Sequence, residues 1–315
     1  MKQDIINQSF KDYQVCEPVD RGGFLVEPMN KCINEAHLLP PLVALYPDIV
    51  LEGDLSIIFG QSGIGKTIFA IQIARYIAEN GKRVLYVDCE MTPRQLGNRY
   101  ETANFPPTFL RAEMDRERPA EDVLKGIEEV AVANHVEVVF IDNITALGQS
   151  LDRSSDAGTL MASLNSLKKK YNWTLVVLNY VPKMFSGNVP LSLSAMQGSA
   201  KLNQLIDDGI GIAQSAIDSN LVYVKQYKWR NGELTMSADH VVLFERRKDK
   251  YGNLGFVSRG FGTEQEHLSI ESGNDREEIK ARVRELSATG MTQTAIAEQL
   301  GISQSKVSRL LKELP

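Results

Sequence analysis

A glycine-rich loop that ends in Lys-Thr is the strongest chemical feature of the sequence. The stretch IIFGQSGIGKTIFA (57–70) matches the pattern G-x-x-x-x-G-K-[ST] through Gly60, Gly65, Lys66 and Thr67. Glycines in such a loop let backbone N–H groups turn onto phosphate oxygens. A lysine there can reach the β and γ phosphates, and the next hydroxyl can hold Mg²⁺. We therefore expect ATP and Mg²⁺ to bind the run Gly60, Gln61, Ser62, Gly63, Ile64, Gly65, Lys66 and Thr67.

Polar residues at the ends of apolar runs can complete a site for hydrolysis. VVFIDN places Asp142 after an apolar run, where an acid can share the metal with Thr67. YVDCEM offers two acids, Asp88 and Glu90. We expect Glu90 to be the general base, because open α/β sheets place ligands at the carboxyl edge of their strands; Asp88 is the alternative base or a supporting partner. Asn179 ends another such run and is a candidate contact for the γ phosphate.

An α/β scaffold must position these groups. From about residue 50, apolar strand runs alternate with helical segments, which predicts a mostly parallel sheet with helices on both faces. After about residue 208 the pattern changes to short strands, and RNGE and DKYGN are typical of hairpin turns. The sequence predicts strands at 55–60, 83–88, 136–142 and 173–179, and helices at 67–78, 120–135 and 157–171.

The order of these motifs resembles that of the RecA-like P-loop ATPases over roughly residues 45–260. Within that group the chain is most similar to plasmid RepA-type and bacterial replicative hexameric helicases. The resemblance implies ATP hydrolysis, DNA as a partner and a homo-oligomeric ring, with a hexamer favoured. We recognise no separate N-terminal domain of the kind that the replicative enzymes have.

The run KQYKWRNGEL is a second point of resemblance. In the replicative helicases a K-x-R-N-G run lies on a late strand and reaches the nucleotide of the neighbouring subunit. By that resemblance Lys228 and Arg230 are catalytic cations that act in trans, and such a cation can be worth roughly 10³–10⁵ in rate. The alternative is a basic hairpin that faces solvent, since Asn-Gly is itself a favoured turn. Family loops just before this region touch DNA, which makes Lys183 and Lys201 candidate contacts, although a plain surface loop explains them equally well.

The C-terminal stretch MTQTAIAEQLGISQSKVSRLLKEL (291–314) predicts a helix-turn-helix. Gly301 suits the exit of the first helix, and Ser303 can cap the second. The pattern resembles the helix-turn-helix ends of resolvases; the alternative is a small helical bundle that contacts protein. The outer face of the second helix carries residue types suited to bases and phosphates: Gln304, Ser305, Lys306, Ser308, Arg309 and Lys312.

The chain is expected to divide into four parts. We predict an N-terminal arm at 1–45, which can pack on a neighbouring subunit, and a RecA-like core at 46–262. A polar linker at 263–274 and a helix-turn-helix domain at 275–315 follow. The fold class is therefore α/β with a small all-α domain.

Composition limits the possible classes of protein. The 315 residues carry a net charge of −5, so any contact with nucleic acid must come from local patches. No apolar run is long enough to span a bilayer and the first residues do not form a signal peptide, so we expect a cytoplasmic protein without a membrane partner. The three cysteines and four histidines are scattered, which predicts free thiols and no metal other than Mg²⁺ with the nucleotide.

Two functions remain open at this point. The first is an ATPase motor or loader, helicase-like, in replication or maintenance of a plasmid or other mobile genetic element. The second is a nucleotide-switched DNA-binding regulator of transcription or partition with slow ATPase. Glu90 and the K-x-R-N-G run favour the first, whereas the helix-turn-helix favours binding at specific duplex sites.

Overall fold

A computed structural model describes most of the chain. The described residues are 19–21, 24–102, 104–114, 120–147, 154–181, 190–193, 199–268, 273–300 and 304–312. The chain divides into two units, Met1–Val43 and Ala44–Pro315. Within the described ranges, no helix has both the length and the apolar character that a bilayer crossing requires.

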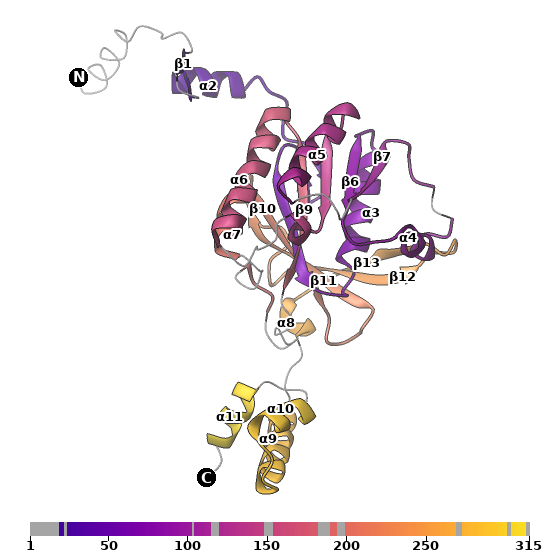
Figure 1. Cartoon of the computed structure of the whole chain (residues 1–315), viewed down its shortest axis with the longest axis vertical. Helices are drawn as coiled ribbons and strands as arrows, with labels where there is room; N and C mark the ends of the chain where they lie inside the picture. The colour runs from indigo at the N-terminus through magenta and orange to yellow at the C-terminus, as the bar shows by residue number, and fades with distance from the viewer. Residues whose placement is uncertain are drawn as a thin grey trace, which may run out of the picture. The chain divides into compact units, whose positions relative to one another are not determined.

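Nine strands of the described residues form one sheet in the order β13-β12-β11-β10-β5-β9-β8-β6-β7 (Figure 1). From β7 to β10 neighbouring strands are parallel, and from β10 to β13 they are antiparallel. This arrangement confirms the predicted mostly parallel sheet with later antiparallel strands. The bounds are β5 Leu55–Gln61, β6 Val84–Asp88, β7 Phe109–Glu113, β8 Val138–Asp142, β9 Thr174–Val181, β10 Asp208–Gln214, β11 Leu221–Trp229, β12 Val241–Lys248 and β13 Leu254–Gly262; a separate short pair joins β3 Ala44–Tyr46 to β4 Val50–Leu51.

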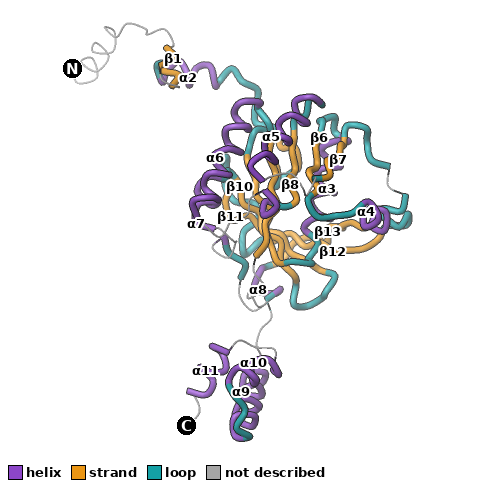
Figure 2. The backbone as a smooth tube through the Cα atoms, viewed as in Figure 1, coloured by secondary structure: helices purple, strands orange, loops and turns teal. Residues whose placement is uncertain are grey.

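Helices cover both faces of this sheet (Figure 2). One apolar cluster joins α5, α6 and α7 to the sheet, and a second joins α3 to its other face. The alternation within β5 explains this division, because Ile57 and Phe59 belong to the first cluster and Ile58 to the second. The bounds are α3 Lys66–Glu79, α4 Pro93–Arg99, α5 Ala120–Ala133, η1 Ile144–Leu147, α6 Ser154–Tyr171 and α7 Ser199–Leu205.

Strand β13 is fixed against α3 by both polar and aromatic contacts. The Gln72 side chain donates to the carbonyl of Phe256 at 3.0 Å and accepts from its N–H at 2.8 Å. The Phe69 ring lies 5.8 Å from the ring of Phe256 and 5.3 Å from that of Phe244. The antiparallel strands are therefore held beside the helix that follows the glycine-rich loop.

The sequence prediction differs from the structure at several places in the core. The edge strand β7 and helix α4 were not predicted, because their short segments have no sustained apolar period. DKYGN does join β12 to β13, but RNGE begins an 11-residue connection (230–240) rather than a tight hairpin. Helix α8 (Glu264–His267) lies within the predicted linker, where Thr263 caps it and Glu264 and His267 are buried.

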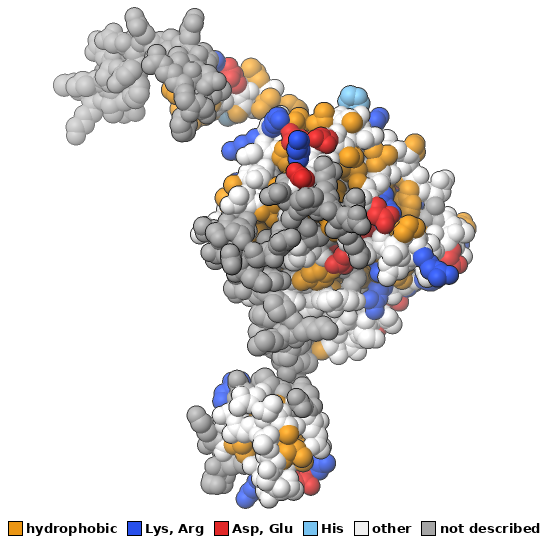
Figure 3. Space-filling view, in the orientation of Figure 1, with side chains coloured by type: hydrophobic (Ala, Val, Ile, Leu, Met, Phe, Trp, Pro, Cys, Tyr) orange, Lys and Arg blue, Asp and Glu red, His pale blue; other side chains and the backbone are white. Residues whose placement is uncertain are grey.

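The N-terminal unit contains its own small elements. Strands β1 (Val19–Arg21) and β2 (Phe24–Val26) pair antiparallel, and helix α2 (Met29–Ala36) follows. No residue of α2 is buried. Apolar side chains are exposed along the described part of this arm (Figure 3), namely Val26, Met29, Ile33, Leu38, Leu39, Leu42 and Val43.

Three helices follow at the C-terminus: α9 (Gly273–Ala288), α10 (Gln293–Leu300) and α11 (Gln304–Lys312). They share a separate apolar core to which Ile296, Val307 and Leu310 contribute. Gly301 and Ser303 lie outside the described residues. The three helices thus have the composition and order expected of a helix-turn-helix unit.

Candidate nucleotide site

The predicted site residues other than Lys228 and Arg230 meet at the carboxyl edge of four neighbouring strands. The glycine-rich loop follows β5, and the register pairs Gly60 with Tyr180 of β9. On the other side of β9, Asp142 ends β8 and is level with Asp88 at the end of β6. Because parallel strands end together, residues far apart in the sequence lie around one loop.

The glycines of the loop are required by its backbone. Gly63 and Gly65 have φ angles of +84° and +102°, which residues other than glycine rarely adopt. A Cβ at Gly60 would lie 2.2 Å from the Ile212 carbonyl oxygen. Gly65 is the N-cap of α3, so the positive end of the helix dipole is directed at the loop.

The Lys66 ammonium lies inside this loop. Lys66 is only 5% exposed, and its Nζ donates to the carbonyl oxygens of Gly60 at 2.9 Å and Gln61 at 2.7 Å. Burial lowers its pKa to about 8, although Asp142 and Glu90 act in the opposite direction. A phosphate would be a stronger acceptor for this cation than two neutral carbonyls.

Asp142 and Thr67 form the pair that suits Mg²⁺. Asp142 is 2% exposed and accepts hydrogen bonds from the Tyr86 hydroxyl, at 2.8 Å, and from the Thr67 side chain. Burial raises the pKa of Asp142 to about 6. Carboxylate and hydroxyl oxygens are the hard ligands that Mg²⁺ prefers, so these two residues fit the predicted metal.

Asp88 and Glu90 have different environments. Asp88 is 2% exposed; it pairs with Arg111 at 2.9 Å and accepts the backbone N–H groups of Glu90 and Met91. Glu90 is exposed at the edge of the sheet. Its carboxylate accepts from the Tyr180 hydroxyl at 2.8 Å and from the Asn143 amide. Asp88 therefore stabilises the turn that follows β6, whereas Glu90 is available to a ligand.

Asn179 is fully buried, and its Oδ1 accepts the N–H of Tyr180 at 2.8 Å. The next residue, Tyr180, is the one that faces Lys66 and Glu90. Asn179 stays a candidate, and the sequence did not suggest Tyr180. The period of two within a strand was a usable signal, since it requires adjacent residues to face opposite sides.

Arg246 is a second residue that the sequence did not identify. It lies on β12 opposite Phe256, and its Nη1 donates to the Gly63 carbonyl at 3.2 Å. The Phe256 ring is also close to the loop, because a Cβ at Gly65 would be 2.9 Å from it. No local pattern identifies Arg246, since only the curl of the antiparallel strands brings it to the loop.

The K-x-R-N-G run lies at the opposite end of the sheet. In the strand register, Trp229 of β11 lies opposite Asp208 of β10, and Asp208 lies opposite Ser56 near the amino end of β5. Lys228 Nζ donates to carbonyls of the chain's own Asn203 and Ile206 at 2.8 and 2.6 Å. Burial lowers the pKa of Lys228.

Arg230 and Asn231 contact buried acids at this end. Arg230 pairs with Asp207 at 2.5 Å while its side chain stays 55% exposed, and Asn231 donates to Asp54 at 2.7 Å. Burial is the main cause that raises the pKa of Asp54, and it raises that of Asp208 to about 7. The chain does not bring Lys228 and Arg230 to its own phosphate loop.

Comparison with known proteins agrees with this geometry. Residues 28–184 match a family model described as an AAA domain, and residues 274–314 match one described as a homeodomain-like domain. The KaiC-like protein PH0186 of Pyrococcus horikoshii has a TM-score of 0.51 at 17% identity, covering 66% of this chain and 91% of that structure. The ATPase domain of G40P has a TM-score of 0.54 at 14% identity, covering 73% and 97%. The core of the chain has a RecA-like fold around its P-loop, and the C-terminal unit is a helix-turn-helix.

A sequence relative extends the comparison. The DNA repair protein RadA of Campylobacter jejuni is 27% identical over 136 residues, which is 42% of this chain and 30% of RadA. The chain thus spans less than a third of the length of that relative. These findings confirm the predicted RecA-like fold and helix-turn-helix.

The described part of the helix-turn-helix leaves some predicted DNA contacts open to solvent. Gln304 and Arg309 are exposed, and Ser308 is half-buried. The side chains of Ser305, Lys306 and Lys312 lie outside the described residues, as do Lys183 and the side chain of Lys201.

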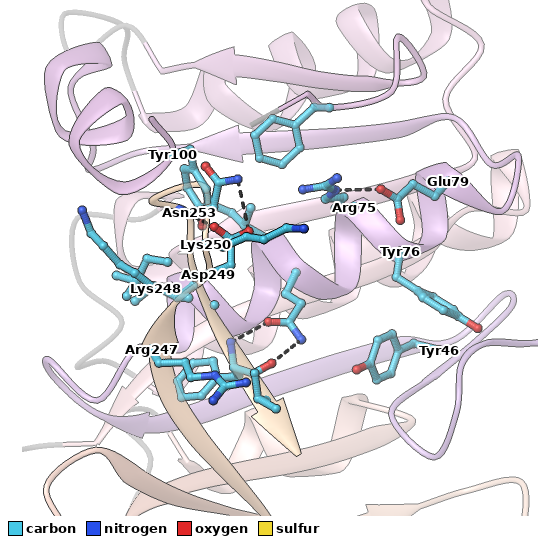
Figure 4. Close-up of a pocket in the computed structure, with 18 residues that line it drawn as sticks. Tyr46, Arg75, Tyr76, Glu79, Tyr100, Arg247, Lys248, Asp249, Lys250 and Asn253 are labelled. Atoms are coloured by element: carbon cyan, nitrogen blue, oxygen red, sulfur yellow. Dashed lines mark hydrogen bonds and ion pairs between the residues drawn. The ribbon is translucent and has the colours of Figure 1, made fainter. Parts of the chain in front are cut away.

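A cavity of about 560 Å³ lies along α3 beside the tip of the β12–β13 pair (Figure 4). Arg75 pairs there with Glu79 at 2.7 Å and lies over the Phe105 ring at 5.4 Å. None of the described residues 60–67 lines this cavity, so it is distinct from the phosphate loop. Its walls also carry Tyr46, Tyr76, Tyr100, Arg247, Lys248 and Lys250.

Proposed function

We propose that the protein is an ATP-hydrolysing, DNA-binding RecA-like motor or loader that works as a ring of identical subunits, with a hexamer favoured. We assign it a helicase-like role in replication or maintenance of a plasmid or other mobile genetic element. ATP and DNA as partners also favour a cytoplasmic location. The RecA-like core, the helix-turn-helix and the similarity to a DNA repair protein support the two binding activities.

The chain's own residues divide the work of hydrolysis. The loop and Lys66 bind the phosphates, and Thr67 and Asp142 would hold Mg²⁺, whose charge would offset that of the phosphates. Glu90 orients the attacking water and takes its proton. These roles agree with the burial of Lys66 and Asp142 and the exposure of Glu90.

The observation that carries the ring is the position of Arg230. Its side chain is 55% exposed at the amino end of the parallel strands, whereas the phosphate loop follows their carboxyl end. A cation so placed cannot serve its own nucleotide, but a neighbouring copy in a ring can bring its nucleotide to it. In this proposal Arg230 leaves Asp207 for the neighbour's phosphate, and Lys228 supports it.

Mixing two inactive variants tests the ring. Arg230→Ala and Lys66→Ala should each abolish ATP hydrolysis, and Arg230→Ala should still bind ATP. A mixture should regain part of the activity, because some interfaces combine an intact loop with an intact arginine. Subunit exchange is first demonstrated with tagged chains, and Arg259→Ala, a surface arginine paired with Glu245, is the control. An inactive mixture after proven exchange would reject the trans arginine.

The N-terminal arm is a second candidate contact between copies. Its helix α2 buries no residue, and apolar side chains such as Leu38 and Leu39 are 85% and 70% exposed. We propose that the arm packs on a neighbouring copy, which would cover this apolar surface. Light scattering of a variant that lacks residues 1–43 should then show a smaller assembly.

The alternative function is a nucleotide-switched DNA-binding regulator with slow ATPase. The helix-turn-helix favours it, because such units bind particular duplex sites. Arg309→Ala in the full chain should lower duplex affinity about tenfold and reduce the salt dependence by about one phosphate contact under either function. Turnover distinguishes them: a motor hydrolyses ATP faster with DNA bound, whereas a switch does not.

A further inference from the structure

We infer that Tyr180 is a positioning residue that holds Glu90 in place for catalysis and keeps it apart from Lys66. The inference rests on the proposed ATPase function and adds a residue that neither the sequence motifs nor the similar proteins identified. Tyr180 lies near the carboxyl end of β9, opposite Gly60 at the start of the phosphate loop.

Tyr180 contacts both functional charges of the site. Its hydroxyl lies 2.8 Å from each carboxylate oxygen of Glu90. Its ring lies under the Lys66 ammonium, with the Nζ atom 4.1 Å from the ring centroid. One half-buried side chain thus presents a donor to the acid and a π face to the cation.

An exposed glutamate needs such support to act as a base. A free Glu side chain samples several rotamers, and ordering it costs conformational entropy. The Tyr180 hydroxyl and the Asn143 amide come from neighbouring strand ends, β9 and the residue after β8, and both donate to Glu90. A base oriented by a third group is a recurring arrangement in enzymes.

Tyr180 also affects the choice of partner for Lys66. Lys66 and Glu90 carry opposite charges and contact the same side chain, Lys66 over the Tyr180 ring and Glu90 at the Tyr180 hydroxyl, so the two charges attract each other. A direct ion pair would withdraw the lysine from the phosphates and the acid from water. Because the tyrosine contacts both groups, it occupies the space such a pair would need.

The test measures ATP turnover and ATP affinity separately in the full chain. Tyr180→Phe removes one oxygen and keeps the ring, so kcat should fall roughly 10-fold to 100-fold, the range expected for a hydrogen bond to a charged group. ATP affinity, measured with a fluorescent ATP analogue, should change less than about twofold. Tyr180→Leu also loses the ring, so ATP affinity should fall as well as kcat.

Two comparisons separate positioning from a general structural effect. In a Glu90→Gln background, Tyr180→Phe should have no further effect on kcat, because the base that it orients is gone. Tyr171→Phe is the matched control: Tyr171 also donates to a glutamate, Glu128, at 2.6 Å, but between α6 and α5. That variant should keep normal kcat.

Each outcome decides the inference. Normal kcat in Tyr180→Phe, or an equal loss of kcat with and without Glu90, would overturn it while leaving the ATPase intact. A wild-type protein that does not hydrolyse ATP would instead reject the proposed function. Should Tyr180→Phe melt at a lower temperature, Tyr180→Gln retains a donor and is expected to recover part of kcat; failure to do so counts against the inference.

Discussion

The two ends of the central sheet treat their charges differently. At the carboxyl end, Lys66, Asp142 and Glu90 surround a loop whose backbone is shaped for phosphate. At the amino end, Arg230 and Asn231 pair with buried acids of the same chain. The carboxyl end can therefore bind a phosphate ligand. At the amino end the acids are paired within the same chain, and the side chain of Arg230 remains exposed. A single chain thus holds the whole phosphate-binding site, whereas its candidate catalytic arginine, Arg230, lies at the opposite end of the sheet.

The largest effect should come from the carboxyl end. Lys66→Ala removes the buried ammonium that donates to Gly60 and Gln61, so ATP binding should weaken strongly and hydrolysis should disappear. Fluorescent-nucleotide titration and phosphate release measure the two effects. Lys82→Ala, which removes a lysine paired with Glu52 on the surface, is the control. Near-normal turnover in a folded Lys66→Ala protein would contradict the assignment of the loop.

The second effect separates the two acids at the carboxyl end of β6, Asp88 within the strand and Glu90 just after it. Glu90→Gln keeps the shape but loses the base, so kcat should fall roughly 10²-fold to 10⁴-fold while ATP still binds. Asp88→Asn breaks a buried pair with Arg111, so it should lower the free energy of unfolding by about 1–3 kcal/mol.

Turnover and thermal melting of both variants provide the check. Since Asp88 also orders the backbone of Glu90, its variant should lose some kcat, but less than Glu90→Gln. The reverse order, with Asp88→Asn inactive and Glu90→Gln active, would make Asp88 the base.

The carboxyl end was largely predictable because its chemistry depends on local patterns. The glycine spacing and the acids at or just after the ends of apolar runs predicted that the loop, Asp142 and Glu90 lie at one edge of the sheet, where the structure has them, and the alternation of elements predicted the parallel sheet. Arg246 and Tyr180 were missed, because their roles depend on register and curl between strands distant in sequence. The buried acids Asp54, Asp207 and Asp208 were missed for the same reason. The segment of helix α8 was predicted to be a linker because its residues are polar. Glu264 and His267 can be buried there because Lys225 and Ser215, which are distant in sequence, pair with them.

A smaller effect is expected from Arg246. Its guanidinium donates to Gly63, so Arg246→Ala should weaken ATP binding about threefold to tenfold and leave the fold intact, as for the loss of one hydrogen bond. Arg247→Ala, the exposed neighbour, is the matched control. Nucleotide titration of the two variants decides: equal affinities would mean that Arg246 only shapes the empty loop.

The smallest effect concerns the pH dependence of stability at the amino end. Burial raises the pKa of Asp208 to about 7 from its ordinary value of 3.8. An acid whose pKa is higher in the folded state adds stability that is fully present below the unfolded pKa and is lost as pH rises through about 7. The melting temperature should therefore decline from about pH 4 to about pH 7 and level off above that. Asp142, whose pKa is raised to about 6, contributes in the same direction up to about pH 6.

Asp208→Asn should remove part of that decline and raise the melting temperature at pH 8. The asparagine stays neutral at every pH, and its carbonyl oxygen can still accept from the N–H of Arg230. Asp249→Asn is the control, because hydrogen bonds from its own turn lower the pKa of Asp249 and its titration ends well below pH 6. Thermal melts at pH 5, 6, 7 and 8 give the slopes. An Asp208→Asn protein with the wild-type slope would show that the Asp208 carboxyl group is ionised over the whole pH range. Arg230 would then lie beside two negative charges, Asp207 and Asp208, rather than one. It would therefore leave them less readily for the phosphate of a neighbouring subunit.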